Sequence, residues 1–232
     1  MKKIFRFMAF AVIALVTAMS LQSCLDDDDD DDKTIIDPNL GANAIVTLKT
    51  NPATGQFYMQ LNDSVTVIPT NMKESPYGNK ELRAIALITY KDKADSFHYS
   101  RSGDVLIIDT IRTKQMSPVV NDIAKTYGTD PLEIINDWVT VCEDGYLTLH
   151  FRTYFGNGKV HTLRLVNTGD NTVTLYHDAN GDNQNNSRPG DGLIAFHLND
   201  LPETNGQYKE ITLKWNSFSG EKSVKFRYKS RD

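Results

Sequence analysis

The segment YLTLHFRTYF, residues 146–155, has the clearest strand pattern in this chain of 232 residues. Its two leucines and two phenylalanines share one face, because successive side chains of a β-strand point to opposite sides. The Gly-Asn-Gly that follows at 156–158 is typical of a hairpin turn and predicts a return strand over 160–166. In that hairpin His161 would lie opposite Thr153.

The same strand pattern repeats on both sides of residues 146–155. Short stretches of alternating apolar and polar residues are bounded by the turn formers Gly, Asn and Asp. They predict further strands at 138–142, 172–177, 193–198, 211–215 and 224–228. Seven short strands at this spacing favour an immunoglobulin-like β-sandwich over residues 138–232.

Residues 40–112 show the same period of two and predict a separate β unit. Five short apolar stretches, with one long polar loop between the third and the fourth, suit a small closed barrel of the OB type. Many OB barrels bind single-stranded nucleic acid along a positively charged groove. The sequence has an export signal and no basic stripe, so we exclude nucleic acid as a partner.

Residues 113–137 break this period and predict a helical connector. Ser117-Pro118 is a favourable helix start, since serine caps the first N–H groups and proline needs no partner there, and Gly128 would end the helix. Asp-Pro-Leu-Glu at 130–133 repeats the start signal and predicts a second helix. The predicted fold is therefore all-β, with an OB-like barrel joined by two short helices to an immunoglobulin-like β-sandwich.

The N-terminal residues have the layout of an export signal. A basic start precedes an apolar run over 7–19, which is shorter than the roughly 20 residues of a transmembrane helix. The run leads to Leu21-Gln22-Ser23-Cys24, which resembles the lipobox of bacterial lipoproteins. That resemblance implies a signal peptide over residues 1–23 and a lipid on Cys24 that holds the protein on a membrane. The alternative is an ordinary secretory signal that happens to contain a cysteine.

An unbroken run of aspartates, Asp26 to Asp32, follows the cysteine. Like charges at this density repel one another and bury nothing, so residues 24–39 are predicted to be a lipidated, acidic tether. The run is a spacer in one interpretation; in another it resembles signals that send some lipoproteins to the cell surface. We expect an outer-membrane lipoprotein of a Gram-negative bacterium that faces either the surface or the periplasm.

Most of the net charge lies in this tether. Cleavage before Cys24 removes three positive charges and changes the formal net charge from −5 to −8. Without residues 26–33, which are seven aspartates and one lysine, the net charge becomes −2. The folded part of the chain is therefore close to neutral.

The polar loop at 178–183 holds the string most like a metal site. Asp178, Asn180 and Asp182 are spaced as at the start of an EF-hand loop, where alternate side-chain oxygens surround one calcium ion. Asn183 occupies the sixth position in place of glycine, and the glutamate of the twelfth position is also missing. A calcium site is one interpretation, and a loop rich in turn-forming residues is the other.

The polar side of the 146–155 strand is the candidate ligand surface. Tyr146, Arg152 and Tyr154 lie there, and we expect them to bind sugar rings or a partner protein through stacking and hydrogen bonds. The alternative is that this side packs against the other domain or the connector. Cys142 lies in an apolar segment and is expected to be a buried, reduced thiol.

The sequence contains no familiar catalytic signature. Its histidines lack the spacing of a metal site, and no nucleophile elbow, phosphate-binding loop or dinucleotide fingerprint occurs. We therefore predict no catalytic residues and no cofactor. Calcium at the 178–183 loop is the one candidate that would change the second prediction.

Three stretches give the chain a specific resemblance to a known family. Asp137-Trp138-Val139-Thr140-Val141, Glu143-Asp144-Gly145-Tyr146-Leu147-Thr148-Leu149 and Lys214-Trp215-Asn216-Ser217-Phe218 are similar to stretches of the NigD-like bacterial lipoproteins. The resemblance covers nearly the whole chain and implies an N-terminal OB-like domain followed by a β-sandwich. It implies no established activity and no catalytic residues. The family name alludes to a bacteriocin-associated gene, so an immunity-type role is implied as an alternative.

These observations together predict a membrane-anchored, non-enzymatic binding module at the cell envelope, with a protein or a glycan as its ligand. A bacteriocin-immunity lipoprotein is one alternative. A hydrolase whose residues are dispersed over the sandwich loops is the other, because a scattered triad leaves no trace in one sequence.

Overall fold

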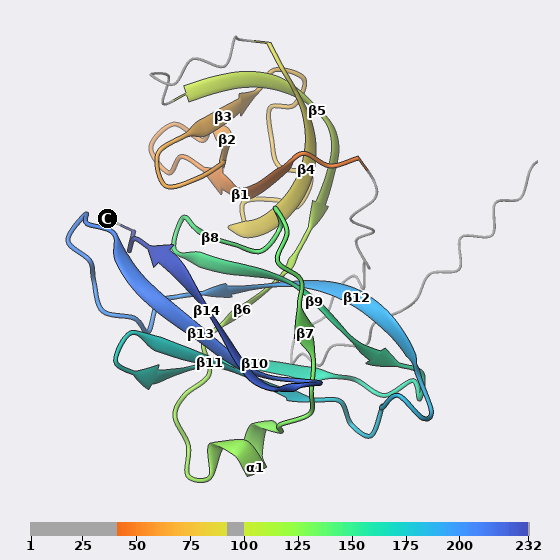
Figure 1. Ribbon diagram of the computed structural model, residues 1–232. Coiled ribbons are helices and arrows are strands. Elements are labelled where there is room, and N and C mark those ends of the chain that lie inside the picture. Colours follow the sequence, from red (N-terminus) through yellow and green to blue (C-terminus); the bar gives the residue numbers. More distant parts are fainter. Residues whose placement is uncertain (1–40, 92–99, 232) are drawn as a thin grey trace, which may run out of the picture.

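The structure is a computed structural model and describes residues 41–91 and 100–231. The predicted signal peptide, Cys24 and the acidic tether lie outside the described residues. The described part forms two β units, a barrel and a sandwich, which lie one above the other in Figure 1. Among these residues no helix has the length and apolar character needed to cross a membrane.

The N-terminal unit is a closed barrel of five strands. Its strands are β1 (Ala44–Thr50), β2 (Phe57–Gln60), β3 (Thr66–Pro69), β4 (Leu82–Tyr90) and β5 (Ser100–Thr110). They close in the order β1-β2-β3-β5-β4, and only β3 and β5 run parallel among the neighbours in this described barrel. Val46, Leu48 and Met59 point inward and have no exposed surface. The predicted OB-like barrel is confirmed.

The C-terminal unit is a sandwich of two sheets. The first sheet contains β10 (Thr162–Gly169), β11 (Thr172–Asp178), β13 (Lys209–Ser217) and β14 (Gly220–Tyr228), in that order. The second contains β6 (Arg112–Gln115), β12 (Arg188–His197), β9 (Tyr146–Phe155) and β7 (Glu133–Ile134), and β8 (Val141–Glu143) pairs with the other end of β9. The predicted β-sandwich is confirmed.

The core of the sandwich is built on the apolar face of β9. Leu147, Leu149 and Phe151 have no exposed surface and pack in one cluster with Leu165 from β10 and Leu213 from β13. Burial of each such side chain contributes about 1.5–3 kcal/mol relative to leaving it in water. The alternation that predicted a strand at 146–155 therefore also supplies the layer that joins the two sheets.

The joint contains one helix among the described residues, where two were predicted. The helix α1 (Ile123–Tyr127) is followed by Gly128 as expected, but it does not begin at Pro118. The start of the expected connector is instead β6, which pairs in parallel with β12 and so belongs to the sandwich. Asp122 precedes the helix in the left-handed region and makes no side-chain capping bond. The Ser117-Pro118 signal therefore does not start a helix.

The second helix, predicted to start at residues 130–133, does not form; this segment instead leads into β7. The N–H of Asp130 donates to the oxygen of His177 at 2.8 Å, and the N–H of Leu132 donates to the oxygen of Asn216 at 3.1 Å. Because a single helical turn is unfavourable on its own, these bonds to two strands of the sandwich outweigh the local start signal.

The hairpin predicted between residues 146–155 and 160–166 is wrong. β9 pairs with β12, whereas β10 pairs with β11 in the opposite sheet, so His161 does not lie opposite Thr153. The carboxylate of Asp182 accepts the N–H groups of Gly156 and Asn157 at 3.0 and 2.8 Å. These bonds hold the chain at the place where it leaves one sheet for the other.

The strand predicted from residue 138 begins later, at Val141. The side chain of Asp137 accepts hydrogen bonds from the N–H groups of Val139 and Thr140 at 3.0 and 3.3 Å. An aspartate that bonds to the main chain two and three residues on stabilises a turn. The β8 strand is therefore short.

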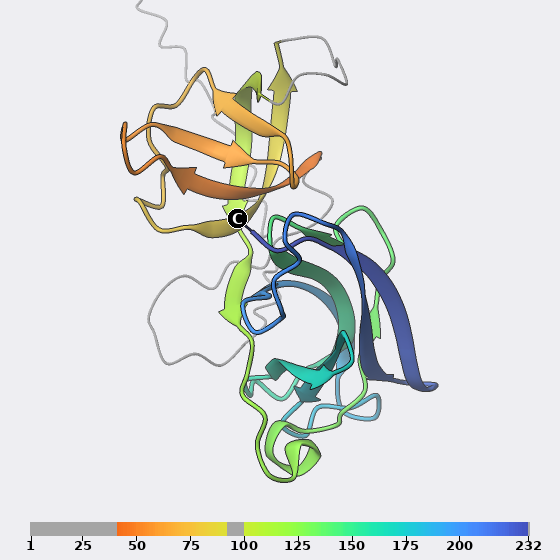
Figure 2. The same cartoon turned by 90° about the vertical axis from the view of Figure 1, so that its left-hand side faces the viewer.

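The barrel rests on the sandwich through the outer faces of β1 and β4, as the turned view in Figure 2 shows. Ile45 and Ile85 point away from the barrel core and pack with Leu193 and Ala195 of β12. Both faces of β1 are covered in this way, which explains why its first five residues are all buried. The joint is thus an apolar contact between two separate cores.

A buried arginine lies in the same joint. Arg83 from β4 has no exposed surface, and it donates from Nη1 to Thr47 and from Nε to Thr148 at 2.9 and 3.2 Å. Burial lowers its pKa, while the nearby carboxylates of Asp144 and Glu143 raise it. The arginine therefore links the barrel to β9 through neutral hydroxyl groups.

Candidate functional site

Tyr146, one of the predicted ligand residues, lies in the joint between the two units. It is 4% exposed, and its hydroxyl donates to Oε1 of Glu81 at 2.7 Å. The guanidinium of Arg231 lies over the ring, 4.6 Å from its centroid. Burial and the Glu81 carboxylate raise the pKa of the Tyr146 hydroxyl, so it remains a donor. This end of the polar side of β9 packs against the other domain, as one of the two sequence interpretations expected.

Arg152 lies at the opposite, exposed end of that side and is held by a bidentate ion pair. Its Nε and Nη2 donate to Oδ1 and Oδ2 of Asp191 at 2.5 and 2.8 Å. These bonds lower the pKa of Asp191 and raise the pKa of Arg152. The buried ring of His150 contacts Asp191 from Nε2 at 3.3 Å and Asp137 from Nδ1 at 2.7 Å. The sheet therefore fixes the position of the Arg152 guanidinium.

Two aromatic rings continue this surface. The ring of Tyr154 meets the ring of Phe218 edge-on, with centroids 5.3 Å apart and an angle of 80° between the planes. Phe218 lies in the turn between β13 and β14 and is 47% exposed. We call Arg152, Asp191, Tyr154 and Phe218 the recognition face. Sequence reasoning did not single out Phe218, because it reaches this face from the other sheet.

A buried polar cluster lies beneath the 178–183 loop, and no spacing in the sequence predicted it. His161 has no exposed surface; its Nδ1 lies 3.0 Å from Nε2 of His177, and its Nε2 lies 3.0 Å from Oδ2 of Asp182. Asp182 also accepts the hydroxyl of Ser187 at 2.7 Å. Burial alone would raise the pKa of Asp182, but the hydrogen bonds that it accepts lower it to about 2.

The buried imidazoles of His150, beside Asp191, and of His161, beneath the 178–183 loop, are already bonded within the protein. Both ring nitrogens of His150 and both of His161 face protein groups at hydrogen-bonding distance. A general base needs a nitrogen within reach of a substrate proton, and neither ring offers one. Cys142 is a free thiol whose pKa is raised by burial, and a protonated thiol is a poor nucleophile.

The three residues of the predicted calcium loop do not turn toward a common point. Asp178 accepts the N–H of Asn180 at 2.8 Å, Asn180 donates to the oxygen of Val160 at 3.2 Å, and Asp182 points into the buried cluster. Across residues 41–91 and 100–231, no group of three or more His, Cys, Asp or Glu side chains is suited to a metal ion. The loop geometry is that of linked turns.

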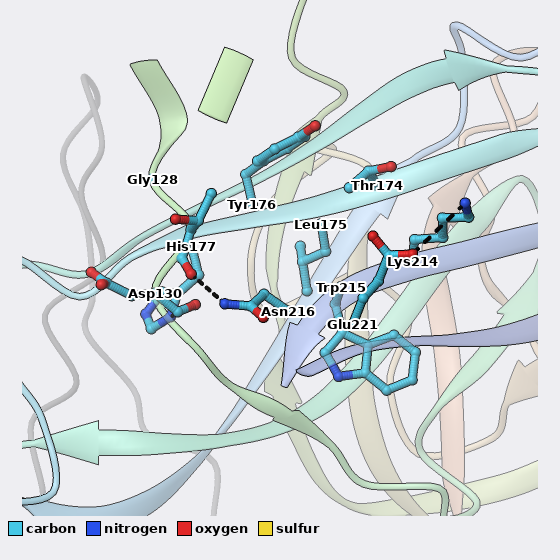
Figure 3. A pocket seen from close by; sticks show the side chains of 11 residues that line it. Gly128, Asp130, Thr174, Leu175, Tyr176, His177, Lys214, Trp215, Asn216 and Glu221 are labelled. Atoms are coloured by element: carbon cyan, nitrogen blue, oxygen red, sulfur yellow. Dashed lines mark hydrogen bonds and ion pairs between the residues drawn. The ribbon is translucent and has the colours of Figure 1, made fainter. Parts of the chain in front are cut away.

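A pocket of about 350 Å³ opens where β11 and β13 diverge, as Figure 3 shows. The two strands pair in parallel as far as Leu175 and Trp215, and the segment after α1 then enters between them. The lining presents both apolar and polar surface and consists of Gly128, Thr129, Asp130, Thr174, Leu175, Tyr176, His177, Lys214, Trp215, Asn216 and Glu221. None of the predicted ligand residues lies in this pocket.

Two family models match the chain, one for each unit. The NigD-like N-terminal OB domain matches residues 45–111, and the NigD-like C-terminal beta sandwich domain matches residues 115–228. The chain belongs to the NigD-like family. The stretches that resemble this family lie at three places: 143–149 in the joint, 137–141 beside His150, and 214–218 along the pocket and the recognition face.

Solved structures share this two-part NigD-like fold. A Parabacteroides distasonis protein whose name describes it as toxin related is 26% identical, with a TM-score of 0.64, and the match covers 80% of this chain and 92% of that one. A Bacteroides vulgatus protein of unknown function is 20% identical, with a TM-score of 0.62 and coverage of 80% and 89%. A NigD-like immunity protein from Bacteroides caccae is 17% identical, with a TM-score of 0.52 and coverage of 78% and 89%. No curated protein matches the chain.

Proposed function

We propose that this NigD-like protein is a membrane-anchored, non-enzymatic binding module at the cell envelope, and that its recognition face binds a protein partner. The observation that carries the proposal is the placement of Arg152 next to the Tyr154–Phe218 pair at the exposed end of β9. A few residues contribute most of the binding energy in protein interfaces, and tyrosine and arginine are enriched among them; phenylalanine is enriched in interface cores. The face thus offers the residue types that such an interface uses.

The recognition face is also organised before any partner arrives. Asp191 holds the Arg152 guanidinium in one orientation, and His150 holds Asp191 from below. A flexible arginine would lose about 0.5–1.5 kcal/mol of side-chain entropy when a partner immobilised it. Because the protein has already restricted this arginine, less of the interaction energy is lost on binding.

The non-enzymatic part of the proposal rests on the state of the reactive side chains. The imidazoles of His150 and His161 are bonded on both nitrogens, and the Cys142 thiol has a raised pKa. These groups stabilise the sandwich, and this use of them disfavours the hydrolase alternative. The anchor in the proposal is the lipid expected on Cys24.

The test is photo-crosslinking on intact cells. A photoreactive phenylalanine analogue replaces Phe218 in one strain and Tyr208 in another, since Tyr208 is an aromatic residue of similar exposure outside the recognition face. We expect a crosslinked protein only from position 218, and we expect Arg152→Ala to abolish it. Equal products from both positions, or none from position 218, would contradict the proposal. Cys24→Ser, which prevents lipidation, should move the protein out of the membrane fraction.

One observation favours immunity against a toxin as a second candidate function. The 26% identical structure from Parabacteroides distasonis is named as toxin related. If this chain acts in immunity, its partner is a bacteriocin-type toxin, and a deletion strain should be more sensitive to bacteriocin preparations. Wild-type protein should restore resistance, and the Phe218→Ala variant should not. Equal resistance of the parent and deletion strains would exclude this role.

A further inference from the structure

We propose that the pocket between β11 and β13 binds one neutral sugar residue, at a site separate from the recognition face. The pocket belongs to the four-stranded sheet of the sandwich, whereas Arg152, Tyr154 and Asp191 project from the other sheet. Phe218, the remaining residue of the recognition face, follows β13 but does not line the pocket. Its side chains come from β11, β13, β14 and the segment after α1 (Figure 3). The proposal does not depend on the identity of any protein partner.

The pocket is preformed, because hydrogen bonds to main-chain oxygens fix its end. Nδ2 of Asn216 donates to the oxygen of Thr129 at 2.6 Å, and the N–H of Asp130 donates to the oxygen of His177 at 2.8 Å. Gly128 has a φ of +81°, and a Cβ there would lie 2.6 Å from that same His177 oxygen. Only glycine lets the chain approach β11 this closely. Binding sites for small ligands are usually preformed in this way.

The polar side chains among the lining residues match a ligand that carries several hydroxyl groups. Nζ of Lys214 lies 3.9 Å from Oε1 of Glu221, and these side chains are 45% and 76% exposed. An ammonium group has three donors and a carboxylate about four acceptor positions, so such a loose pair retains capacity for a ligand. Thr174 on the adjacent strand adds a hydroxyl that bonds to the Thr168 hydroxyl at 3.0 Å and keeps a further lone pair for a ligand. Neighbouring hydroxyls of a sugar, each a donor and an acceptor, can bond to both members of the pair.

An aromatic ring completes the lining. Tyr176 lies along the β11 side of the pocket in Figure 3, and its ring contacts Tyr127 of α1 at a centroid distance of 6.3 Å and an angle of 58°. Arg164, the β10 partner of Tyr176, lies over the Tyr127 ring, 5.9 Å from its centroid. These contacts hold the Tyr176 ring in place. An aromatic ring beside polar groups suits a ligand with one apolar and one polar side, as a sugar ring has.

The charge and size of the pocket narrow the class of ligand. Lys214 is the one cation in the lining, while Glu221 and Asp130 are both carboxylates, so an acidic ligand would meet a net negative wall. A purely apolar ligand would have to desolvate these groups without replacing their bonds to water. A volume of about 350 Å³ lies at the lower end of the range for ligand pockets. A single neutral sugar residue carries no negative charge, offers hydroxyl groups to the polar side chains and is small enough for the pocket.

Saturation-transfer NMR on the full protein, solubilised in a detergent without a sugar headgroup, tests the proposal. The probes are the methyl glycosides of glucose, galactose, mannose and N-acetylglucosamine, with methyl glucuronide as the acidic comparison. We expect at least one neutral glycoside to bind at millimolar concentration or tighter, and the glucuronide to bind at least tenfold more weakly. Tyr176→Ala and Lys214→Met should each weaken that binding at least tenfold, whereas Tyr154→Ala on the recognition face should leave it unchanged.

Three results would overturn the proposal. These are the absence of transfer to every neutral glycoside, a preference for the glucuronide, and unchanged affinity in the Lys214→Met variant. Because Lys214 is half exposed, its replacement is not expected to unfold the sandwich, and a thermal melt of each variant checks this. Binding of a sugar without any crosslinked partner at Phe218 would support this site and contradict the proposed protein-binding role, so the two proposals fail separately.

Discussion

Arg231 donates from Nε to the main-chain oxygen of Asp144 and from Nη2 to the Asp144 carboxylate, at 2.6 and 2.9 Å. Asp144 has a positive φ of 52°, and its other carboxylate oxygen accepts Nζ of Lys49 at 2.8 Å. Arg231 also donates from Nη1 to Glu81. Arg231, which follows β14, therefore joins the sandwich turn at Asp144 to Glu81, which precedes β4 of the barrel. Asp144 itself makes the second link, to Lys49 of β1.

Replacing Arg231 with alanine should lower the free energy of unfolding by about 2–4 kcal/mol. The variant loses hydrogen bonds to charged groups and leaves the 7% exposed Asp144 with one cation fewer. Urea unfolding measures the change. Lys225→Ala is the matched control, because the pair of Lys225 with Glu210 is 64% and 60% exposed and should contribute less than about 1 kcal/mol. Equal losses in the two variants would show that the Arg231 contacts do not hold the units together.

Replacing Asp182 with alanine should destabilise the sandwich by about 2–4 kcal/mol, since the N–H groups of Gly156 and Asn157 and the ring of His161 lose their acceptor. Asp178→Ala is the control and should cost less than about 1 kcal/mol, because Asp178 is exposed. Thermal melts of both variants provide the comparison.

Millimolar calcium should leave the melting temperature of the wild-type protein unchanged, because Asp178 accepts a main-chain N–H within its own turn while Asp182 points into the buried cluster, so the two carboxylates do not share a site. A ligand that binds only the folded state raises stability according to its concentration relative to its Kd. A clear rise in the melting temperature with calcium, removed by a chelator, would restore the metal interpretation of the loop.

The sandwich should lose stability between about pH 6.5 and pH 4 because of His177. Burial and the neighbouring His161 lower the pKa of His177 to about 4, so the folded state favours the neutral ring. A lowered folded-state pKa contributes stability that is present above the unfolded value of about 6.5 and is lost as the pH falls through 4. The loss is about 3 kcal/mol at most. His177→Gln should flatten the unfolding free energy over this window, and an unchanged slope would exclude His177 as its source.

Replacing Gly192 with alanine should destabilise the sandwich by about 1–3 kcal/mol. A Cβ at position 192 would lie 2.6 Å from Cζ of Phe151, which is fully buried and has no room to retreat. The double variant Gly192→Ala with Phe151→Leu should recover part of the loss relative to the sum of the single variants, because the smaller side chain removes the clash. Purely additive effects in chemical unfolding would show that the two residues do not compete for the same space.

The sequence by itself determined the all-β class, the barrel of five strands and the sandwich. These features follow from period-two alternation, which is a local pattern set by the geometry of a strand. The same pattern identified Leu147, Leu149 and Phe151 as core residues. It also placed Arg152 and Tyr154 on the polar side of their strand.

The tertiary structure alone decided which strands pair and which polar residues meet. The Gly-Asn-Gly turn predicted a hairpin, but Asp182, distant in sequence, binds the N–H groups at that turn where the chain changes sheet. Arg83, which an isolated strand would expose, is buried because a second domain covers its face. The pocket exists because a segment after α1 separates β11 from β13. Contacts of this kind join residues far apart in the chain, and no local period records them, because the free energy that selects them arises only when the two units and the two sheets pack together.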